Sequence, residues 1–289
     1  MPPFLDLTAI IRLWEPAMKK NIIIIIICIA LAGVGYLSYP SVREWWYSLR
    51  ETYRLNVYLT SLRDMREIDY DSLFERAEAY NANIAKKGMN RKLSNSEMDA
   101  YEAELNVEKT GIMGYIIIPK LELTMPIYHG TDERVLQTSV GHIEGTSLPV
   151  GGGSTHCVLT GHRGIPSAKL LTGIDQLSEG DIWTINVLDK TLTYEVDQIK
   201  TVEPAELADI AIEQDKDYCT LVTGTPFGVN SKRLLVRGHR IQNVQGDARF
   251  TVDALRIRPS FIEPFVVISA LVLLLVIMFL PIWKIEDRD

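Results

Sequence analysis

Hydrophobic residues follow three different patterns along the chain. Two long apolar runs lie near the ends, at residues 21–42 and 265–283. Residues 43–87 carry apolar side chains near the i, i+3 and i+4 spacing of an amphipathic helix. From Gly111 onward, short β-branched and aromatic stretches alternate with turn residues. This change predicts a mainly β domain, a barrel or a sandwich, rather than alternating strands and helices.

Each apolar run is long enough to cross a membrane. Both runs are free of charge, and about 18 to 20 apolar residues suffice for a transmembrane helix. Arg12, Lys19 and Lys20 precede the first run, which places the N-terminus in the cytoplasm and the central segment outside the cell membrane. A cleaved signal peptide is the alternative for the first run, but its apolar core is usually only about 7–15 residues long. We therefore favour a retained membrane anchor.

Punctuating residues divide the central segment into a helical part and a β part. Gly88 ends the first helical pattern, and Ser94 with Glu97 three residues later has the sequence of an N-terminal capping box. The expected organisation is a cytoplasmic N-terminus at 1–20, a membrane span at 21–42, a helical stalk and packing element at 43–110, the β domain at 111–243, a linker at 244–260, a second span at 261–283 and a cytoplasmic tail at 284–289.

Composition narrows the range of functions. The net charge is −7 and the basic residues are scattered, so we expect no nucleic-acid partner. Of the three cysteines, Cys28 lies within the first apolar run, and the remaining two are too few for a disulfide framework. The histidines and cysteines lack the spacing of a metal site, and the glycine-rich segment 148–156 has no phosphate-loop lysine. We expect neither a metal nor a cofactor.

Three chemically useful positions lie at predicted strand ends. His162 closes "VLTGH", Gly224 closes "TLVTG", and Arg233 follows across the turn "TPFGVNSK". A barrel can bring such ends together, in an arrangement that suits a nucleophile at position 224 between an imidazole and a cation. A single histidine at a strand end more often has a packing role, so the spacing alone leaves both interpretations open. Apolar candidates for a binding surface, which could equally be core residues, are Val158, Ile165, Val222 and Leu235.

The segments "GHIEGTSLPVGGGSTHCVLTGHRG" and "YCTLVTGTPFGVNSKRLLVRGHRI" resemble the sortases, specifically the class C, pilin-polymerising sortases of Gram-positive bacteria. The resemblance covers about residues 111–241 and extends to the membrane span expected at each end. It implies a closed β-barrel of about eight strands with short helices. The family's histidine, its TLxTC strand and its arginine fall on His162, Thr220–Gly224 and Arg233.

The resemblance also implies a reaction. A cysteine thiolate attacks the Thr–Gly bond of an LPxTG-like sorting signal, and a pilin lysine amine resolves the thioester. His162 would act as the acid and base, and Arg233 would hold the substrate and stabilise the oxyanion. In this chain Gly224 stands at the position of the nucleophilic cysteine. Because glycine has no side chain, we expect the chain as written to be inactive in the covalent steps.

No other residue is expected to replace the missing thiol. Cys219 and Cys157 lie five positions before Gly224 and His162, and this odd offset along a strand directs them to the opposite face. A second departure lies in residues 88–101, which lack the Asp-Pro-aromatic tripeptide of a class C lid. The equivalent helix would begin at Ser94 or Asn95.

Three hypotheses remain at this stage. The chain is a class C sortase whose nucleophile has been replaced, by engineering or by natural variation. Alternatively, it is a natural non-catalytic adaptor, anchored in the membrane, that binds sorting signals or pilins. A purely structural β domain of the cell envelope is the third, against which the presence of both His162 and Arg233 argues.

Overall fold

The computed structural model describes residues 53–63, 65, 67–90, 92–163, 170–206 and 208–243, with a few isolated positions between Ile25 and Tyr39. Two compact units are distinguished, residues 46–256 and a second unit formed by both ends of the chain. The predicted membrane spans, the linker at 244–260 and the tail at 284–289 fall outside the described ranges, apart from those isolated positions. Within the part of the chain that is described, no helix combines the length and apolar character needed to cross a bilayer.

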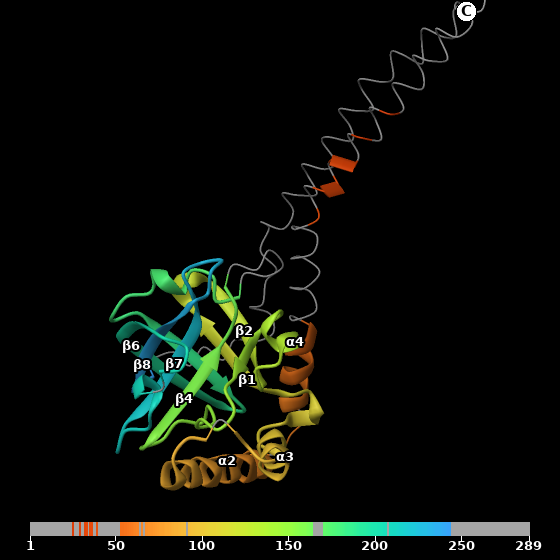
Figure 1. Ribbon diagram of the computed structural model, residues 1–289. Helices are drawn as coiled ribbons and strands as arrows, with labels where there is room; N and C mark the ends of the chain where they lie inside the picture. Colours follow the sequence, from red (N-terminus) through yellow and green to blue (C-terminus); the bar gives the residue numbers. More distant parts are fainter. Residues whose placement is uncertain are drawn as a thin grey trace, which may run out of the picture. The chain divides into compact units, whose positions relative to one another are not determined.

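Eight strands form a closed barrel in the order β1-β2-β3-β4-β7-β8-β6-β5 (Figure 1). The strands are β1 Ile112–Ile118, β2 Leu123–His129, β3 Val140–His142, β4 Thr155–Thr160, β5 Ile182–Val187, β6 Lys190–Val202, β7 Asp217–Thr225 and β8 Lys232–Ile241. The prediction of a closed, mainly β barrel of about eight strands is confirmed, and the sandwich alternative is wrong. Most neighbours are antiparallel, but β2 pairs with β3 in parallel and β4 pairs with β7 in parallel.

Helical segments precede the barrel and lie against it. Residues 53–63 are helical, and the principal helices are α2 Glu67–Lys87, α3 Asn95–Ala103 and the short α4 Glu133–Leu136. Single 3-10 turns occupy Val107–Lys109, Pro119–Leu121, Ile174–Gln176 and Ala208–Ile210. Ser94 caps α3 and forms the predicted capping box with Glu97. Figure 1 shows α2 and α3 together at one end of the barrel.

Buried polar contacts attach these helices to the barrel. The Asn81 side chain on α2 accepts a hydrogen bond from Leu148 N at 2.7 Å and donates one to Leu148 O at 3.1 Å. The hydroxyl of Tyr101 on α3 lies 2.9 Å from Nδ1 of His142. Nε2 of His142 lies 2.8 Å from the carbonyl oxygen of Ser147. The described helical residues are therefore packed onto the barrel.

Side chains alternate between the barrel interior and a smaller outer cluster. Cys157 and Cys219, which pair directly between β4 and β7, belong to the main core with Trp183. Val158 and Val222, each an odd number of residues away, belong to the outer cluster. The predicted separation of the two cysteines from the face of residue 224 is therefore confirmed. Burial raises the pKa of the Cys157 thiol well above its usual value, which makes it a poor nucleophile.

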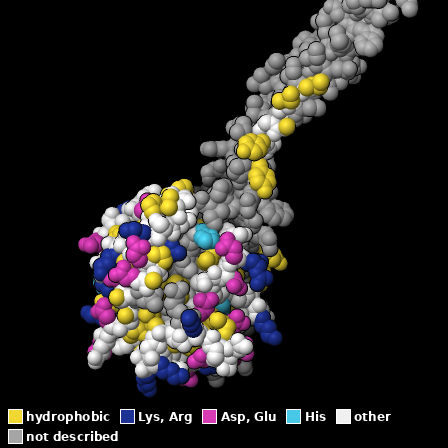
Figure 2. Space-filling view, in the orientation of Figure 1, with side chains coloured by type: hydrophobic (Ala, Val, Ile, Leu, Met, Phe, Trp, Pro, Cys, Tyr) yellow, Lys and Arg dark blue, Asp and Glu magenta, His cyan; other side chains and the backbone are white. Residues whose placement is uncertain are grey.

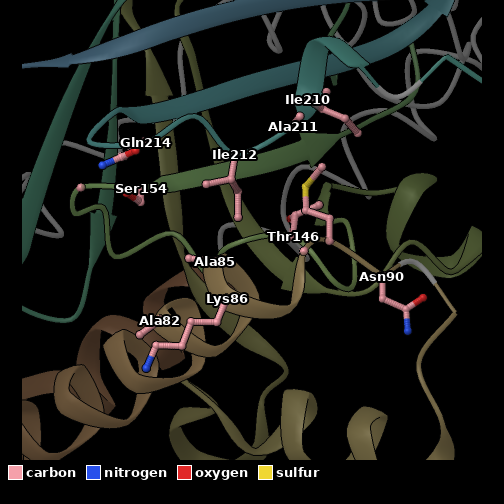
Figure 3. A pocket seen from close by; sticks show the side chains of 13 residues that line it. Ala82, Ala85, Lys86, Asn90, Thr146, Ser154, Ile210, Ala211, Ile212 and Gln214 are labelled. Atoms are coloured by element: carbon pink, nitrogen blue, oxygen red, sulfur yellow. The ribbon is translucent and has the colours of Figure 1, made fainter.

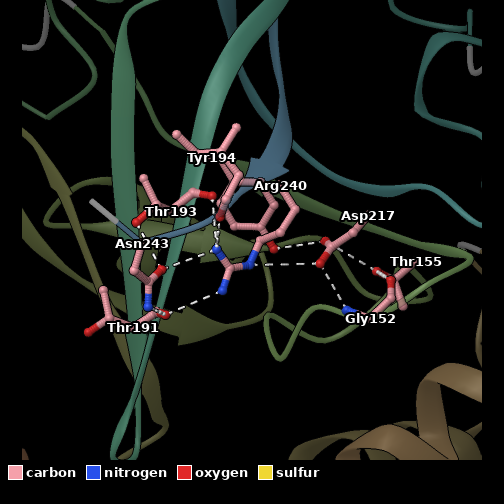
Figure 4. Close-up of polar contacts among 9 residues, drawn as sticks. Gly152, Thr155, Thr191, Thr193, Tyr194, Asp217, Arg240 and Asn243 are labelled. Atoms are coloured by element: carbon pink, nitrogen blue, oxygen red, sulfur yellow. Dashed lines mark hydrogen bonds and ion pairs between the residues drawn. The ribbon is translucent and has the colours of Figure 1, made fainter. Parts of the chain in front are cut away.

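A network around Asp217 fixes the beginning of β7 (Figure 4). Its carboxylate accepts hydrogen bonds from Gly152 N at 2.9 Å and from the Tyr194 hydroxyl at 3.0 Å, and Arg240 Nε lies 4.0 Å away. The hydroxyl of Thr155, the first residue of β4, is 3.4 Å from the same carboxylate. Because these contacts join the starts of β4 and β7, they also set which residues meet at the far ends of the two strands.

Candidate active site

The parallel register of β4 and β7 brings His162 level with Gly224. Thr160, the last residue of β4, pairs with Val222. His162 and Gly224 each follow two residues later, and the hydrogen bond from Gly161 N to Val222 O at 3.3 Å continues the contact beyond the end of β4. Two residues that are far apart in the sequence thus occupy equivalent positions on neighbouring segments.

On its other side Gly224 lies opposite Arg233. The antiparallel pairing of β7 with β8 places these two residues directly across from one another. His162, Gly224 and Arg233 therefore form one row across three neighbouring segments of the barrel, which we call the strand-end row. Its central member has no side chain.

The imidazole of His162 has an acidic neighbour that sequence reasoning missed. Its Nε2 lies 3.4 Å from Oε2 of Glu133 on α4, and the imidazole is 36% exposed. A hydrogen bond from Gln137 and then the imidazole of His162 lower the pKa of Glu133, so this carboxylate is charged at neutral pH. An imidazole within reach of a substrate can transfer protons as a general acid and base.

Arg233 interacts with the turn between β7 and β8. Its Nη1 donates to the carbonyl oxygens of Asn230 at 2.9 Å and Lys232 at 3.0 Å. The guanidinium has further N–H donors, which can bind a peptide carbonyl or an oxyanion. The turn thus positions the predicted cation at its own end of the strand-end row.

The space above Gly224 is already filled. A Cβ built on Gly224 would overlap Oδ1 of Asn230 and would lie 2.7 Å from its Cγ and 2.9 Å from its Cβ. These separations are shorter than real Cβ contacts. Asn230 is an exposed residue of the β7–β8 turn, and its role could not have been anticipated from the spacing of the family motifs.

A second arginine lies next to the strand-end row. The side chain of Arg163 is only 7% exposed, and its Nη1 lies 3.3 Å from Oδ1 of Asp175. Its Nη2 lies 3.4 Å from the hydroxyl oxygen of Thr225, and its Cζ lies over the Phe227 ring, 5.9 Å from the ring centre. Arg163 therefore joins the segment after β4 to the Ile174–Gln176 turn and to the β7–β8 turn.

Three of the four predicted apolar candidates are brought together. Val158, Val222 and Leu235 share the outer cluster with Ile143, with Val202 at the end of β6 and with Ile210, and Met89 packs against them. The cluster is buried, so a ligand reaches it only if a covering residue moves. Ile165 lies outside the described residues.

A pocket of about 980 Å³ lies at the other end of β4 (Figure 3). It is bounded by Ala82, Ala85 and Lys86 of α2, by Thr146 and Ser154, and by residues 210–212 and Gln214. Ser154 precedes and His162 follows β4, whose residues Thr155–Thr160 span about 17 Å at the rise of an extended chain. The pocket is thus separate from the strand-end row, although Met89 and Ile210 also contact the outer cluster.

The charges of this face are mixed. Figure 2 shows acidic and basic side chains interspersed over the barrel surface, in agreement with the scattered basic residues of the sequence. In the described ranges, no group of three histidine, cysteine or acidic residues could hold a metal ion. The strand-end row itself presents an imidazole and a guanidinium.

Comparisons with known proteins agree with this architecture. A model of the sortase domain matches residues 116–241. Sortase D of Bacillus subtilis is 30% identical over 143 residues, which cover 48% of this chain and 69% of that protein. Sortase C1 from Streptococcus agalactiae is 51% identical, with a TM-score of 0.64, over 65% of this chain and 97% of the solved chain.

A further solved structure is sortase C of Clostridium perfringens with the C-terminal cell wall sorting motif. It is 39% identical, with a TM-score of 0.57, over 65% of this chain and 97% of that chain. The structural neighbours thus include class C sortases from different genera. From its barrel, its strand-end row and these relatives, we conclude that the chain belongs to the sortase family.

Proposed function

We propose that this chain binds LPxTG-like sorting signals of pilin proteins as a class C sortase whose nucleophile is replaced by Gly224. Active class C enzymes are cysteine transpeptidases that join pilin subunits through a lysine amine. The observation that carries the proposal is the strand-end row, with an imidazole and a guanidinium on either side of a glycine. The sorting motif named with the Clostridium perfringens enzyme supports the substrate class.

Each side chain of the row has a proposed role. His162 would transfer protons to the leaving amine and from the attacking amine, with Glu133 beside it to orient the ring. Arg233 would bind the substrate and stabilise the oxyanion. We propose that the apolar residues of the signal approach Val158, Ile165, Val222 and Leu235, which requires the cover over the outer cluster to open.

The chain as written should bind peptide without forming a covalent intermediate. Acyl transfer through a thioester needs a thiol at position 224, and Cys157 and Cys219 lie buried in the barrel interior. This burial also favours the second candidate function, a non-catalytic adaptor that binds sorting signals or pilins. Restoring the thiol distinguishes the two.

The test compares the parent chain with Gly224→Cys in the presence of an LPxTG-like peptide. If the chain is a sortase, Gly224→Cys should gain the mass of the acyl group and then transfer the acyl group to a lysine amine. The parent should bind peptide without forming an adduct. A variant that binds peptide but never acylates would favour the adaptor. Amide transfer by the parent chain would refute the proposal.

We also propose that residues 21–42 and 261–283 anchor the protein in the cell membrane, with the barrel outside. The proposal depends on the length and apolar character of the two runs. Protease added to intact cells should degrade the barrel and leave the N-terminal segment protected. If the barrel resists protease in intact cells and is degraded only after lysis, the proposed orientation is wrong.

A further inference from the structure

The obstacle over Gly224 differs from those at other crowded glycines. A Cβ on Gly114 or Gly141 would collide with a backbone carbonyl, that of Asn186 or Gly130. At Gly224 the nearest three atoms all belong to the side chain of Asn230, which is exposed and lies on a turn. An exposed side chain can rotate or move with its turn, so the space at position 224 is closed by a removable group.

The turn that carries Asn230 is tightly hydrogen bonded. The amides of Val229 and Asn230 both donate to the carbonyl oxygen of Pro226, at 3.1 and 2.9 Å. Asn230 has a φ of +56°, a left-handed conformation that asparagine and glycine adopt more readily than other residues. The turn therefore holds the Asn230 side chain over Gly224 through its backbone conformation.

The same residue also contacts the cation of the strand-end row. Arg233 Nη1 donates to the carbonyl oxygen of Asn230 at 2.9 Å, while the side chain of Asn230 covers Gly224. A movement of residue 230 that opens the space at position 224 would also remove one carbonyl acceptor from the guanidinium. An N–H donor of Arg233 would then be available for a peptide carbonyl.

We propose that Asn230 is a positioning residue that closes the strand-end row, because its side chain occupies the space of a residue-224 side chain and its carbonyl holds Arg233. A peptide reaches the row only after residue 230 moves, and any cysteine placed at position 224 must displace it. This inference rests on the proposed function for the identity of the ligand, but the closure itself can be tested without any peptide.

The reactivity of a thiol at position 224 measures the closure directly. Gly224→Cys is made in the full chain with Cys28→Ser, and the rate of alkylation by iodoacetamide is measured. Asn230→Gly is then added, since glycine removes the overlapping atoms and tolerates the φ of +56°. Relief of such overpacking should raise the rate about tenfold. Buried Cys157 and Cys219 serve as unreactive internal references.

Two matched variants separate closure from general loosening of the turn. Asn230→Ala keeps the Cβ that would lie 2.9 Å from the Cβ of residue 224, so it should accelerate alkylation less than Asn230→Gly. Ser231→Gly changes the neighbouring exposed residue and should leave the rate unchanged. Equal rates in the Asn230 parent, Asn230→Gly and Asn230→Ala would overturn the proposal, as would an equal acceleration by Ser231→Gly.

A stability cycle keeps the proposal testable even if the cysteine variant folds poorly. Gly224→Ala is introduced with and without Asn230→Gly, and the unfolding equilibrium constant is measured. Gly224→Ala should raise the unfolding constant about tenfold more in the chain that keeps Asn230 than in the chain with Asn230→Gly. If the effects of the two substitutions are additive, the closure by Asn230 is wrong.

Peptide binding then separates this inference from the proposed function. With Gly224 retained, Asn230→Gly should lower the Kd for an LPxTG-like peptide about tenfold. If thiol reactivity follows the expected order but neither chain binds peptide, the closure stands and the proposed ligand is wrong. If peptide binds equally well to both chains and the reactivities are equal, the proposed function stands and the closure is wrong.

Discussion

Lowering the pH from 7 to 5 should destabilise the barrel through His142. This histidine is fully buried between the hydroxyl of Tyr101 on α3 and the carbonyl of Ser147. Burial lowers the pKa of His142 from its ordinary value of 6.5 to about 4. The unfolded chain therefore binds a proton between these two values that the folded chain excludes, and stability is lost as the pH falls through this window.

The magnitude follows from the separation of the two pKa values. Each pKa unit corresponds to about 1.4 kcal/mol, so the full effect at low pH is about 3 kcal/mol, and about 2 kcal/mol of it is lost by pH 5. Burial also lowers the pKa values of His129 and His156, which adds to the effect in the same direction. A variant is needed to isolate the contribution of His142.

Urea unfolding of the full chain, followed by circular dichroism at pH 7 and pH 5, measures this contribution. His142→Gln should lose less stability than the parent between these pH values, by about 2 kcal/mol. Between pH 7 and pH 8 His142 is neutral in the folded chain and mostly neutral in the unfolded chain, so parent and variant should change by nearly the same amount there. An unchanged loss between pH 7 and pH 5 in the variant would refute the assignment to His142.

Three further predictions concern packing and reactivity. Gly238→Ala should destabilise the barrel by about 1–3 kcal/mol in thermal unfolding, because the new Cβ would lie 2.7 Å from the ring of buried Trp183. Gly153→Ala is the matched control and should have little effect, because its new Cβ would lie 3.9 Å from the nearest atom. Asn81→Ala should lower the free energy of unfolding by about 1–3 kcal/mol, because it leaves the buried amide and carbonyl of Leu148 unpaired. Asn83 is exposed, so Asn83→Ala should have little effect, and equal losses in the two variants would contradict the attachment of α2 through Asn81. Cys157 should resist iodoacetamide in the native chain and react after denaturation, because its thiol is buried with a raised pKa, and rapid native labelling found by mass spectrometry would contradict this packing.

The barrel could be anticipated because its strands carry strong local signals. The β-branched stretches, the capping box at Ser94 and the end of α2 before Gly88 all follow from neighbouring residues, and the structure confirms them. Local sequence does not determine whether the strands close into a barrel. The residues alone left a sandwich open, and only the family resemblance favoured the pairing that closes the barrel.

The sequence predicted only those residues of the site that belong to recognisable motifs. His162, Gly224 and Arg233 were identifiable because each ends or begins a recognisable strand. Glu133 and Asn230 carry no such mark, since one lies on a four-residue helix and the other on an exposed turn. Their importance depends on side-chain contacts between segments, which periodicity and spacing do not report.

The parallel pairing of β4 with β7 has a consequence for the time course of folding. Residues paired between β4 and β7 are 62 positions apart in the sequence. The loop formed by the intervening chain must therefore close before His162 and Gly224 come together. Contacts between such distant residues slow folding, because the entropy of loop closure is lost before the contacts compensate for it. A nascent or partly folded chain in which only the β1–β2 and β5–β6 hairpins have formed therefore lacks the strand-end row, so the proposed peptide binding would require the completed barrel.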